Sequence, residues 1–113
     1  MNDLLRKIRL FNQERDWGKY HSPKNLAMAL MIEAGELAEH FQWLTEDESR
    51  KPAAAKRDRI KEEIGDVLIY LTNLADQLGI DPIRAAHEKI ERNRIKYPTE
   101  MARGKAGKYN EQE

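Results

Sequence analysis

Apolar residues recur every three or four positions along two long segments of the chain, and this spacing constrains the fold more than any other feature. In residues 23–44 the stripe is Leu26, Leu30, Ala34, Leu37, Phe41 and Leu44. In residues 53–78 it is Ile60, Ile64, Val67, Leu68, Leu71, Leu74 and Leu78. This spacing places the side chains on one face of an α-helix. We therefore expect an all-α fold, because no segment shows a convincing strand pattern.

Capping signals extend this prediction to four helices. Ser22-Pro23 and Asp81-Pro82 each place a capping side chain directly before a proline, a usual start of a helix. The expected helices span about 3–16, 23–44, 53–78 and 82–96, with a charged loop at 45–52. A chain of 113 residues has room for one domain, so we expect residues 1–113 to form a single domain in which 98–113 are a flexible basic tail.

The composition excludes several classes of partner. The 20 basic and 20 acidic residues cancel, so net charge gives no attraction to nucleic acid or anionic membranes. There is no cysteine, which excludes disulfides and thiolate chemistry. No apolar run approaches the roughly 20 residues that span a bilayer, and the first residues lack a signal-peptide core. We expect a cytoplasmic protein with no membrane or nucleic-acid partner, and association of copies would help so small a domain.

Four acidic residues interrupt the apolar faces of the two long helices. Glu33 and Glu63 each lie three residues after one stripe residue and four before the next, which places them on the buried face. Glu36 and Asp66 follow them by three positions, giving the patterns ExxE and ExxD. Burying several carboxylates together is costly unless protons or cations neutralise them.

The pattern alone leaves two interpretations of these acids open, a solvated helix surface and a metal site. Ligands that are all oxygen suit hard cations such as Mg²⁺ or Mn²⁺, and magnesium usually also binds phosphate oxygens. A di-iron carboxylate bundle would need ExxH on two helices, and no histidine of the chain completes that motif. The metal interpretation therefore favours magnesium and a phosphorylated substrate.

Ordered motifs along almost the whole chain carry a resemblance to a known family. The two acidic patterns read EAGE at 33–36 and EIGD at 63–66. The other matching stretches are RDWGKYHSPKNLAMAL (15–30), EAGELAEHFQW (33–43), EEIGDVLIYL (62–71), NRIKYP (93–98) and ARGKAGKY (102–109). Together they resemble the all-α nucleotide pyrophosphohydrolases of the MazG type, and most of all the dCTP pyrophosphatase group.

The resemblance implies a fold and a reaction. The fold is a four-helix bundle that assembles as a dimer or as a tetramer built from two dimers. The reaction is Mg²⁺-dependent hydrolysis of a nucleoside triphosphate, dCTP or a modified dCTP, to the monophosphate and pyrophosphate, as part of nucleotide-pool housekeeping. Mn²⁺ is a possible substitute for Mg²⁺. The implied metal ligands and catalytic residues are Glu33, Glu36, Glu63 and Asp66, with Glu33 as our candidate general base.

The resemblance also implies a set of residues that hold the nucleotide. These are Trp17, Gly18, Lys19, Tyr20, His21, Trp43, Tyr70, Asn93 and Tyr109. Lys96 lies one turn after Asn93 and can reach the same site. The chain departs from the animal members at Ile8, where they carry a histidine. Alternative interpretations are a dUTP or broad-specificity pyrophosphohydrolase, and a helical interaction module without catalysis.

Overall fold

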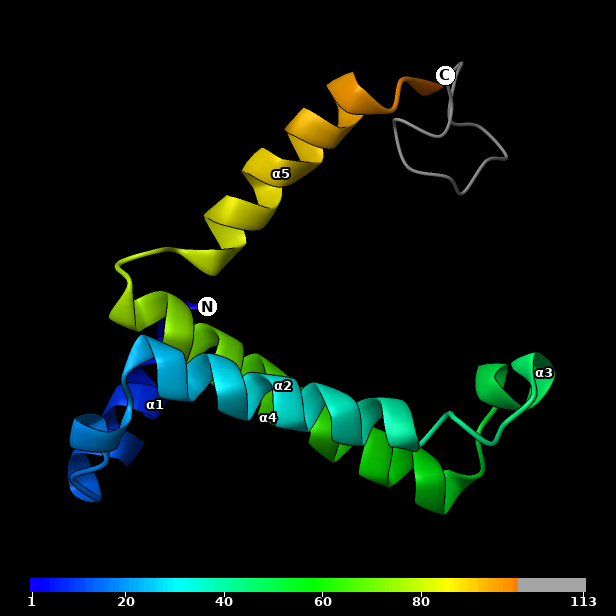
Figure 1. The fold of residues 1–113 in the computed structure, drawn as a ribbon, viewed down its shortest axis with the longest axis horizontal. Coiled ribbons are helices and arrows are strands. Elements are labelled where there is room, and N and C mark those ends of the chain that lie inside the picture. The colour runs from blue at the N-terminus through cyan, green and yellow to red at the C-terminus, as the bar shows by residue number, and fades with distance from the viewer. Residues whose placement is uncertain (100–113) are drawn as a thin grey trace. The chain divides into compact units, whose positions relative to one another are not determined.

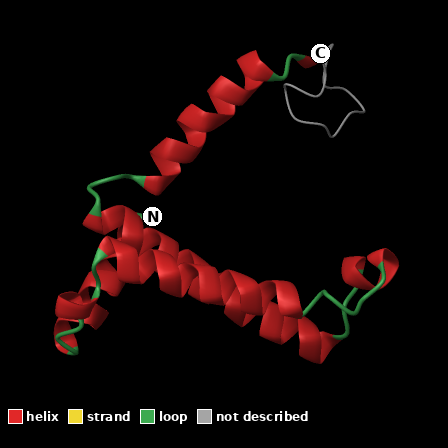
Figure 2. Cartoon of the chain, viewed as in Figure 1, coloured by secondary structure: helices red, strands yellow, loops and turns green. Residues whose placement is uncertain are grey.

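The computed structural model describes residues 1–99, and every regular element in this range is helical (Figures 1 and 2). The elements are α1 (Asn2–Glu14), the 3-10 turn η1 (Gly18–Tyr20), α2 (Pro23–Glu39), α3 (Glu46–Arg50), α4 (Ala54–Gln77) and α5 (Pro82–Lys96). The prediction of an all-α fold is confirmed. None of the helices in the described part is long and apolar enough to cross a membrane.

Side-chain caps start two helices where the sequence predicts them. The Ser22 hydroxyl accepts a hydrogen bond of 3.1 Å from the backbone N–H of Asn25, with proline at the first position of α2. The Asp81 carboxylate accepts hydrogen bonds from the backbone N–H groups of Ile83 and Arg84, at 3.0 and 3.2 Å. In each case the cap satisfies backbone donors that the first helical turn leaves without a partner.

The predicted end of the second helix and the predicted loop after it are both wrong. α2 ends at Glu39, five residues before the expected end at residue 44, and residues 46–50 form the short helix α3. After Glu39 the backbone forms turns, in which Phe41 N–H donates to Ala38 O and Leu44 N–H to Phe41 O, both at 3.0 Å. A reciprocal cap then starts α3: the Thr45 hydroxyl accepts from the Glu48 N–H at 3.1 Å, and the Glu48 carboxylate accepts from the Thr45 N–H at 2.9 Å. The apolar spacing that continues to Leu44 therefore does not extend α2.

The chain divides by its internal contacts into two compact units, residues 1–80 and 81–113. In the first unit α2 and α4 lie side by side with opposite chain directions, and α1 packs against α4 (Figure 1). The second unit contains α5. The single-domain organisation and the four-helix bundle therefore remain predictions.

The buried core of the first unit is small. Its apolar members are Ile8, Leu26, Ile60 and Ala75, from α1, α2 and α4. Two polar residues of α4, Thr72 and Asn73, are buried with them. Within α4, Thr72, Asn73 and Ala75 lie in the last two turns, whereas Ile60 lies in the second turn.

Much of the predicted apolar stripe is not buried within the chain. On α4 the stripe residues Ile64, Leu68 and Leu71 are between 40% and 52% exposed. On α2, Met28, Met31 and Ile32 lie outside the predicted stripe and are between 51% and 60% exposed. The expectation that this face of α4 is buried is wrong for the single chain, because α2 and α1 cover only part of the helix.

A two-point ion pair ties α1 to α4. The Arg9 guanidinium donates to both carboxylate oxygens of Asp76, with Nε–Oδ2 and Nη2–Oδ1 distances of 2.9 and 2.5 Å. This contact holds the pKa of Asp76 below its usual range, mainly through the hydrogen bonds from Arg9. Just beyond, Gly79 has a φ of +67° that favours glycine, and it ends α4.

Candidate active site

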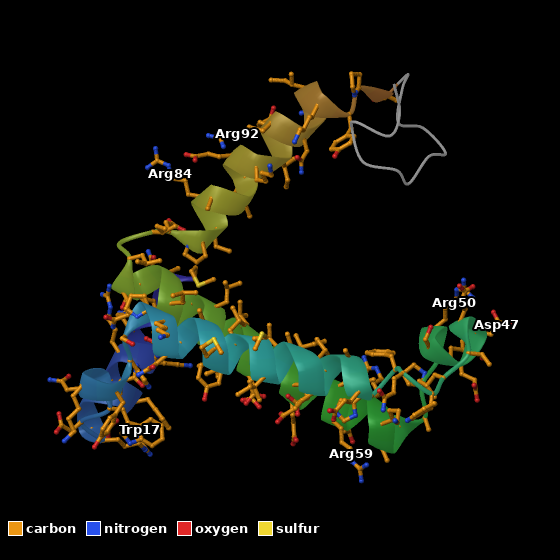
Figure 3. The ribbon with its side chains drawn as sticks, viewed as in Figure 1. Trp17, Asp47, Arg50, Arg59, Arg84 and Arg92 are labelled. Carbon is orange, nitrogen blue, oxygen red and sulfur yellow. The ribbon has the colours of Figure 1, made fainter. Side chains whose placement is uncertain are left out.

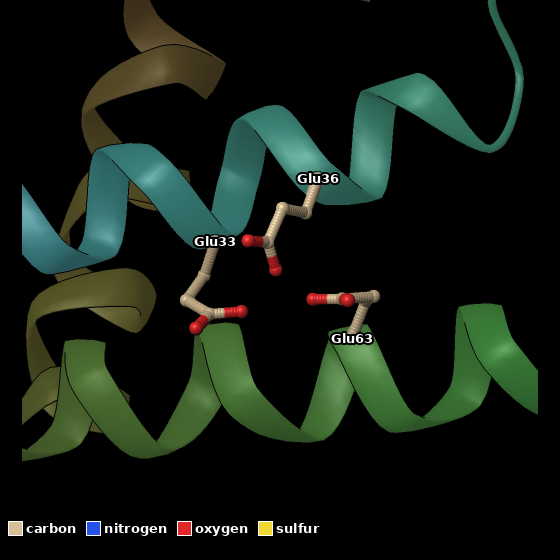
Figure 4. A group of neighbouring side chains, drawn as sticks. All are labelled: Glu33, Glu36 and Glu63. Carbon is tan, nitrogen blue, oxygen red and sulfur yellow. The ribbon is translucent and has the colours of Figure 1, made fainter.

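Three of the four predicted acidic residues meet between α2 and α4. Glu33 and Glu36 extend from α2 toward Glu63 of α4 (Figure 4). One carboxylate oxygen from each residue lies within 4.8 Å of the other two. The three-residue spacing of ExxE places its two acids on adjacent turns of one face, which is why both reach the same partner helix.

These carboxylates lack partners of opposite charge. The Oε2 atoms of Glu33 and Glu63 are buried and have no hydrogen-bond partner among the described residues. Burial raises the pKa of Glu33 to about 7, and the neighbouring carboxyls of Glu63 and Glu36 add to the rise. The charge of Asp66 acts in the same direction. The cluster therefore needs protons or a cation to be neutral.

Asp66 lies next to this group without being part of it. It follows Glu63 by one turn on α4, and it lines a cavity bounded by α1, α4 and the segment around η1. Asp66 thus lies between the acidic cluster and the cavity.

The cavity contains three residues that the sequence assigns to nucleotide binding, namely Trp17, His21 and Tyr70. Its volume is about 360 Å³, near the lower end of the ~300–1,000 Å³ range of ligand pockets. Apolar side chains form much of the remaining wall, including Ile8 and Phe11 of α1 and Ile69 of α4. Ile8, the position of departure from the animal members, is therefore part of this wall.

Aromatic rings form one side of the cavity. Phe11 and Trp17 meet edge to face with their ring centroids 5.4 Å apart, and Trp17 meets His21 in the same manner at 6.3 Å. Trp17, labelled in Figure 3, remains 43% exposed. A tryptophan that is supported at its edge and open to solvent offers a surface on which a planar base can stack.

The other predicted substrate contacts do not line this cavity. Within Gly18–Tyr20, Lys19 pairs with Asp16 at 3.1 Å on the surface, and Tyr20 is exposed. Trp43 follows α2 and is 87% exposed. Asn93 and Lys96 lie on α5, in the second unit, and Tyr109 lies outside the described residues. Their roles stay predictions.

One polar residue of the cavity wall, Asn73, was not singled out from the sequence. It is only 4% exposed, and its Nδ2 lies 3.1 Å from Nδ1 of His21. Asn73 follows Tyr70 by three positions and Asp66 by seven, so helical periodicity places all three on one face of α4. That spacing was the available signal.

Comparisons with known proteins agree on one family. A model of the MazG-like family matches residues 28–111. The chain is 42% identical to the proteins named dCTP pyrophosphatase 1 of Rattus norvegicus and Homo sapiens, over 98% of this chain and 66% of theirs. It thus spans slightly less than two thirds of their length. The crystal structure of a pyrophosphatase from Archaeoglobus fulgidus superposes with a TM-score of 0.82 at 46% identity, covering 87% of this chain and 92% of that one.

Proposed function

The chain belongs to the MazG-like family, and from this premise we propose that it hydrolyses a nucleoside triphosphate to the monophosphate and pyrophosphate. The proposed substrate is dCTP or a modified dCTP, because the relatives at 42% identity are named dCTP pyrophosphatases. The observation that carries the proposal is the convergence of three acids from α2 and α4 beside an aromatic cavity. The proposed setting is nucleotide-pool housekeeping in the cytoplasm.

The donor set of the acidic cluster fits a divalent cation. All the candidate ligand atoms are carboxylate oxygens, and two buried oxygens, one each on Glu33 and Glu63, lack a partner. Hard ions such as Mg²⁺ prefer such ligands, and Mn²⁺ accepts them as well. We propose that Glu33, Glu36 and Glu63 hold Mg²⁺ together with Asp66. The bound cation would neutralise phosphate oxygens and lower the pKa of an attacking water.

Side chains of the cavity and of the acidic cluster position the two ends of the substrate. Trp17 and Tyr70 contact the base in the cavity, which directs the phosphates past Asp66 toward the acids. His21 and the exposed residues of η1 extend this surface. Glu33, at the centre of the cluster, is our candidate for accepting the proton of the attacking water.

We further propose that the protein works as a homodimer or a tetramer. Several large apolar side chains of α2 and α4 are 40% to 60% exposed in the single chain, which supports association. A second copy would cover them and complete the bundle. In that assembly, the exposed Trp43 is a predicted contact that would complete the nucleotide site.

A product assay tests the proposed function. The protein is incubated with dCTP and Mg²⁺, and the products are separated chromatographically, with excess chelator in the control. We expect dCMP and pyrophosphate only when the cation is present. A panel of dUTP, dTTP, purine and modified nucleotides then defines the preference. Diphosphate and phosphate as products would mean cleavage between the β- and γ-phosphates and would contradict the proposed cleavage between the α- and β-phosphates. No turnover of any nucleotide would favour a non-catalytic interaction module.

A further inference from the structure

The polar pair at the wall of the cavity, Asn73 and His21, presents hydrogen-bonding groups whose pattern depends on how the two side chains bond to each other. Asn73 is one of the two buried polar residues in the described part of the chain, and it lines the aromatic cavity. A buried amide is costly unless its groups are used. The one hydrogen bond that the structure gives its side chain is to Nδ1 of His21, at 3.1 Å.

This hydrogen bond couples the orientation of the amide to the tautomer of the imidazole. If Asn73 Nδ2 donates to Nδ1, the neutral imidazole carries its proton on Nε2, and the groups left over are an acceptor (Asn73 Oδ1) and a donor (His21 Nε2–H). If the amide is turned around, Nδ1–H donates to Oδ1, and the groups left over are a donor on Asn73 and an acceptor on His21. In both arrangements the pair offers one donor and one acceptor.

A pyrimidine base has a matching edge. Cytosine presents an amino donor at position 4 beside an acceptor at N3, whereas uracil presents an acceptor at position 4 beside an N3–H donor. When the base is held in one orientation, each base satisfies one arrangement of the pair and leaves unpaired groups in the other, and unpaired buried polar groups are strongly rejected. The remaining charged wall residues serve other interactions: Asp66 adjoins the acidic cluster, and Lys7 lies 3.5 Å from Asp3 on the surface.

We propose that the Asn73–His21 pair selects the pyrimidine base, with the arrangement it holds deciding between cytosine and uracil. This inference rests on the proposed function, because it places the base of the nucleotide in the aromatic cavity. Asn73 and His21 are then residues that determine specificity and touch the substrate without taking part in bond cleavage.

The test compares the ratio of kcat/KM for dCTP to kcat/KM for dUTP in the wild type and in variants. Asn73→Asp keeps the shape of the side chain but only accepts hydrogen bonds, so it should move this ratio by about tenfold or more. His21→Ala should move the ratio toward one. The double variant should resemble His21→Ala, because the two residues act as one unit.

A matched control makes the same amide-to-acid exchange one turn further along α4. Gln77 is exposed and does not line the aromatic cavity, so Gln77→Glu should keep the wild-type ratio. Circular dichroism checks folding, and a purely structural defect would lower both kcat/KM values together and leave the ratio unchanged. A wild-type ratio near one, or an unchanged ratio in Asn73→Asp, would overturn the inference.

The inference can fail separately from the proposed function. If the wild type hydrolyses dCTP but Asn73→Asp leaves the ratio unchanged, only the base-selecting pair is refuted. If no nucleotide is hydrolysed, calorimetric titration with dCMP and dUMP measures the same selectivity as a ratio of Kd values. Equal Kd values, or a ratio unaffected by Asn73→Asp, would then overturn the inference as well.

Discussion

Helix α4 meets its two neighbours through charged residues at two places, and the two places are opposites. Toward α2 it places Glu63 against Glu33 and Glu36, so that like charges converge. Toward α1 it places Asp76 against Arg9, so that opposite charges pair through two hydrogen bonds. The first contact raises the pKa of Glu33 and the second lowers the pKa of Asp76. A contact between paired opposite charges stabilises the fold. A contact between like charges lacks a counter-charge and is therefore available to bind a cation.

The largest expected effect follows from changing one acid of the α2–α4 cluster. Glu63→Gln keeps the size of the side chain and removes its charge, so we expect nucleotide hydrolysis to fall by at least about 100-fold. Steady-state kinetics with dCTP and Mg²⁺ measures the loss. The control is Glu62→Gln, the same exchange at the exposed neighbouring position, which should retain activity. Full activity in Glu63→Gln would contradict the proposal that Glu63 is a ligand of the divalent cation.

Divalent cations should stabilise the protein through this contact. A ligand that binds only the folded state at 100 times its Kd adds about 2.7 kcal/mol of stability. We expect the melting temperature to rise with Mg²⁺ or Mn²⁺ concentration in calorimetry, and to rise much less in Glu63→Gln. An equal rise in both proteins would mean that the ions act elsewhere.

The two contacts should respond to pH with opposite signs in the metal-free protein. The pKa of Glu33 is raised from 4.5 to about 7, so its favourable contribution is complete below 4.5 and is lost as pH rises through about 7. The pKa of Asp76 is lowered from 3.8, so its contribution is present above 3.8 and is lost as pH falls through its lower folded value. Melting curves in chelator between pH 3 and pH 8 measure both slopes. Glu33→Gln should remove the decline between pH 5 and pH 8, and a decline that persists would assign it to other groups.

The smallest expected effect follows from breaking the ion pair between Arg9 and Asp76. Asp76→Asn removes the charge that Arg9 pairs with, and the exposed position of Arg9 limits the cost to a fall of a few degrees in melting temperature. Hydrolysis of dCTP should be reduced far less than in Glu63→Gln. If Asp76→Asn abolished activity while the protein stayed folded, the assignment of a purely structural role to the Arg9–Asp76 pair would be wrong.

The sequence predicts the like-charge contact much better than the rest of the site. Carboxylates on an apolar stripe violate the expected pattern, so Glu33 and Glu63 stand out without any structure. Asn73 breaks no rule, because an amide is ordinary on a charged helix and its burial depends on contacts with distant segments, such as the one with His21. The contact of α1 with α4 likewise joins Arg9 and Asp76, 67 residues apart, which no local pattern connects. The prediction of a loop at 45–52 is wrong because the cap formed by Thr45 and Glu48 starts a short helix there.

One helix, α4, carries both Glu63 of the acidic cluster and Asn73 of the cavity wall. An α-helix rises about 1.5 Å per residue, so the ten residues from Glu63 to Asn73 span about 15 Å. In the proposed complex the base lies at one end of this span and the phosphates at the other. The distance along α4 from Glu63 to Asn73 would then determine the length of nucleotide that fits. A nucleotide with fewer phosphates would fall short of the acids, and one with more would bring a different bond to them.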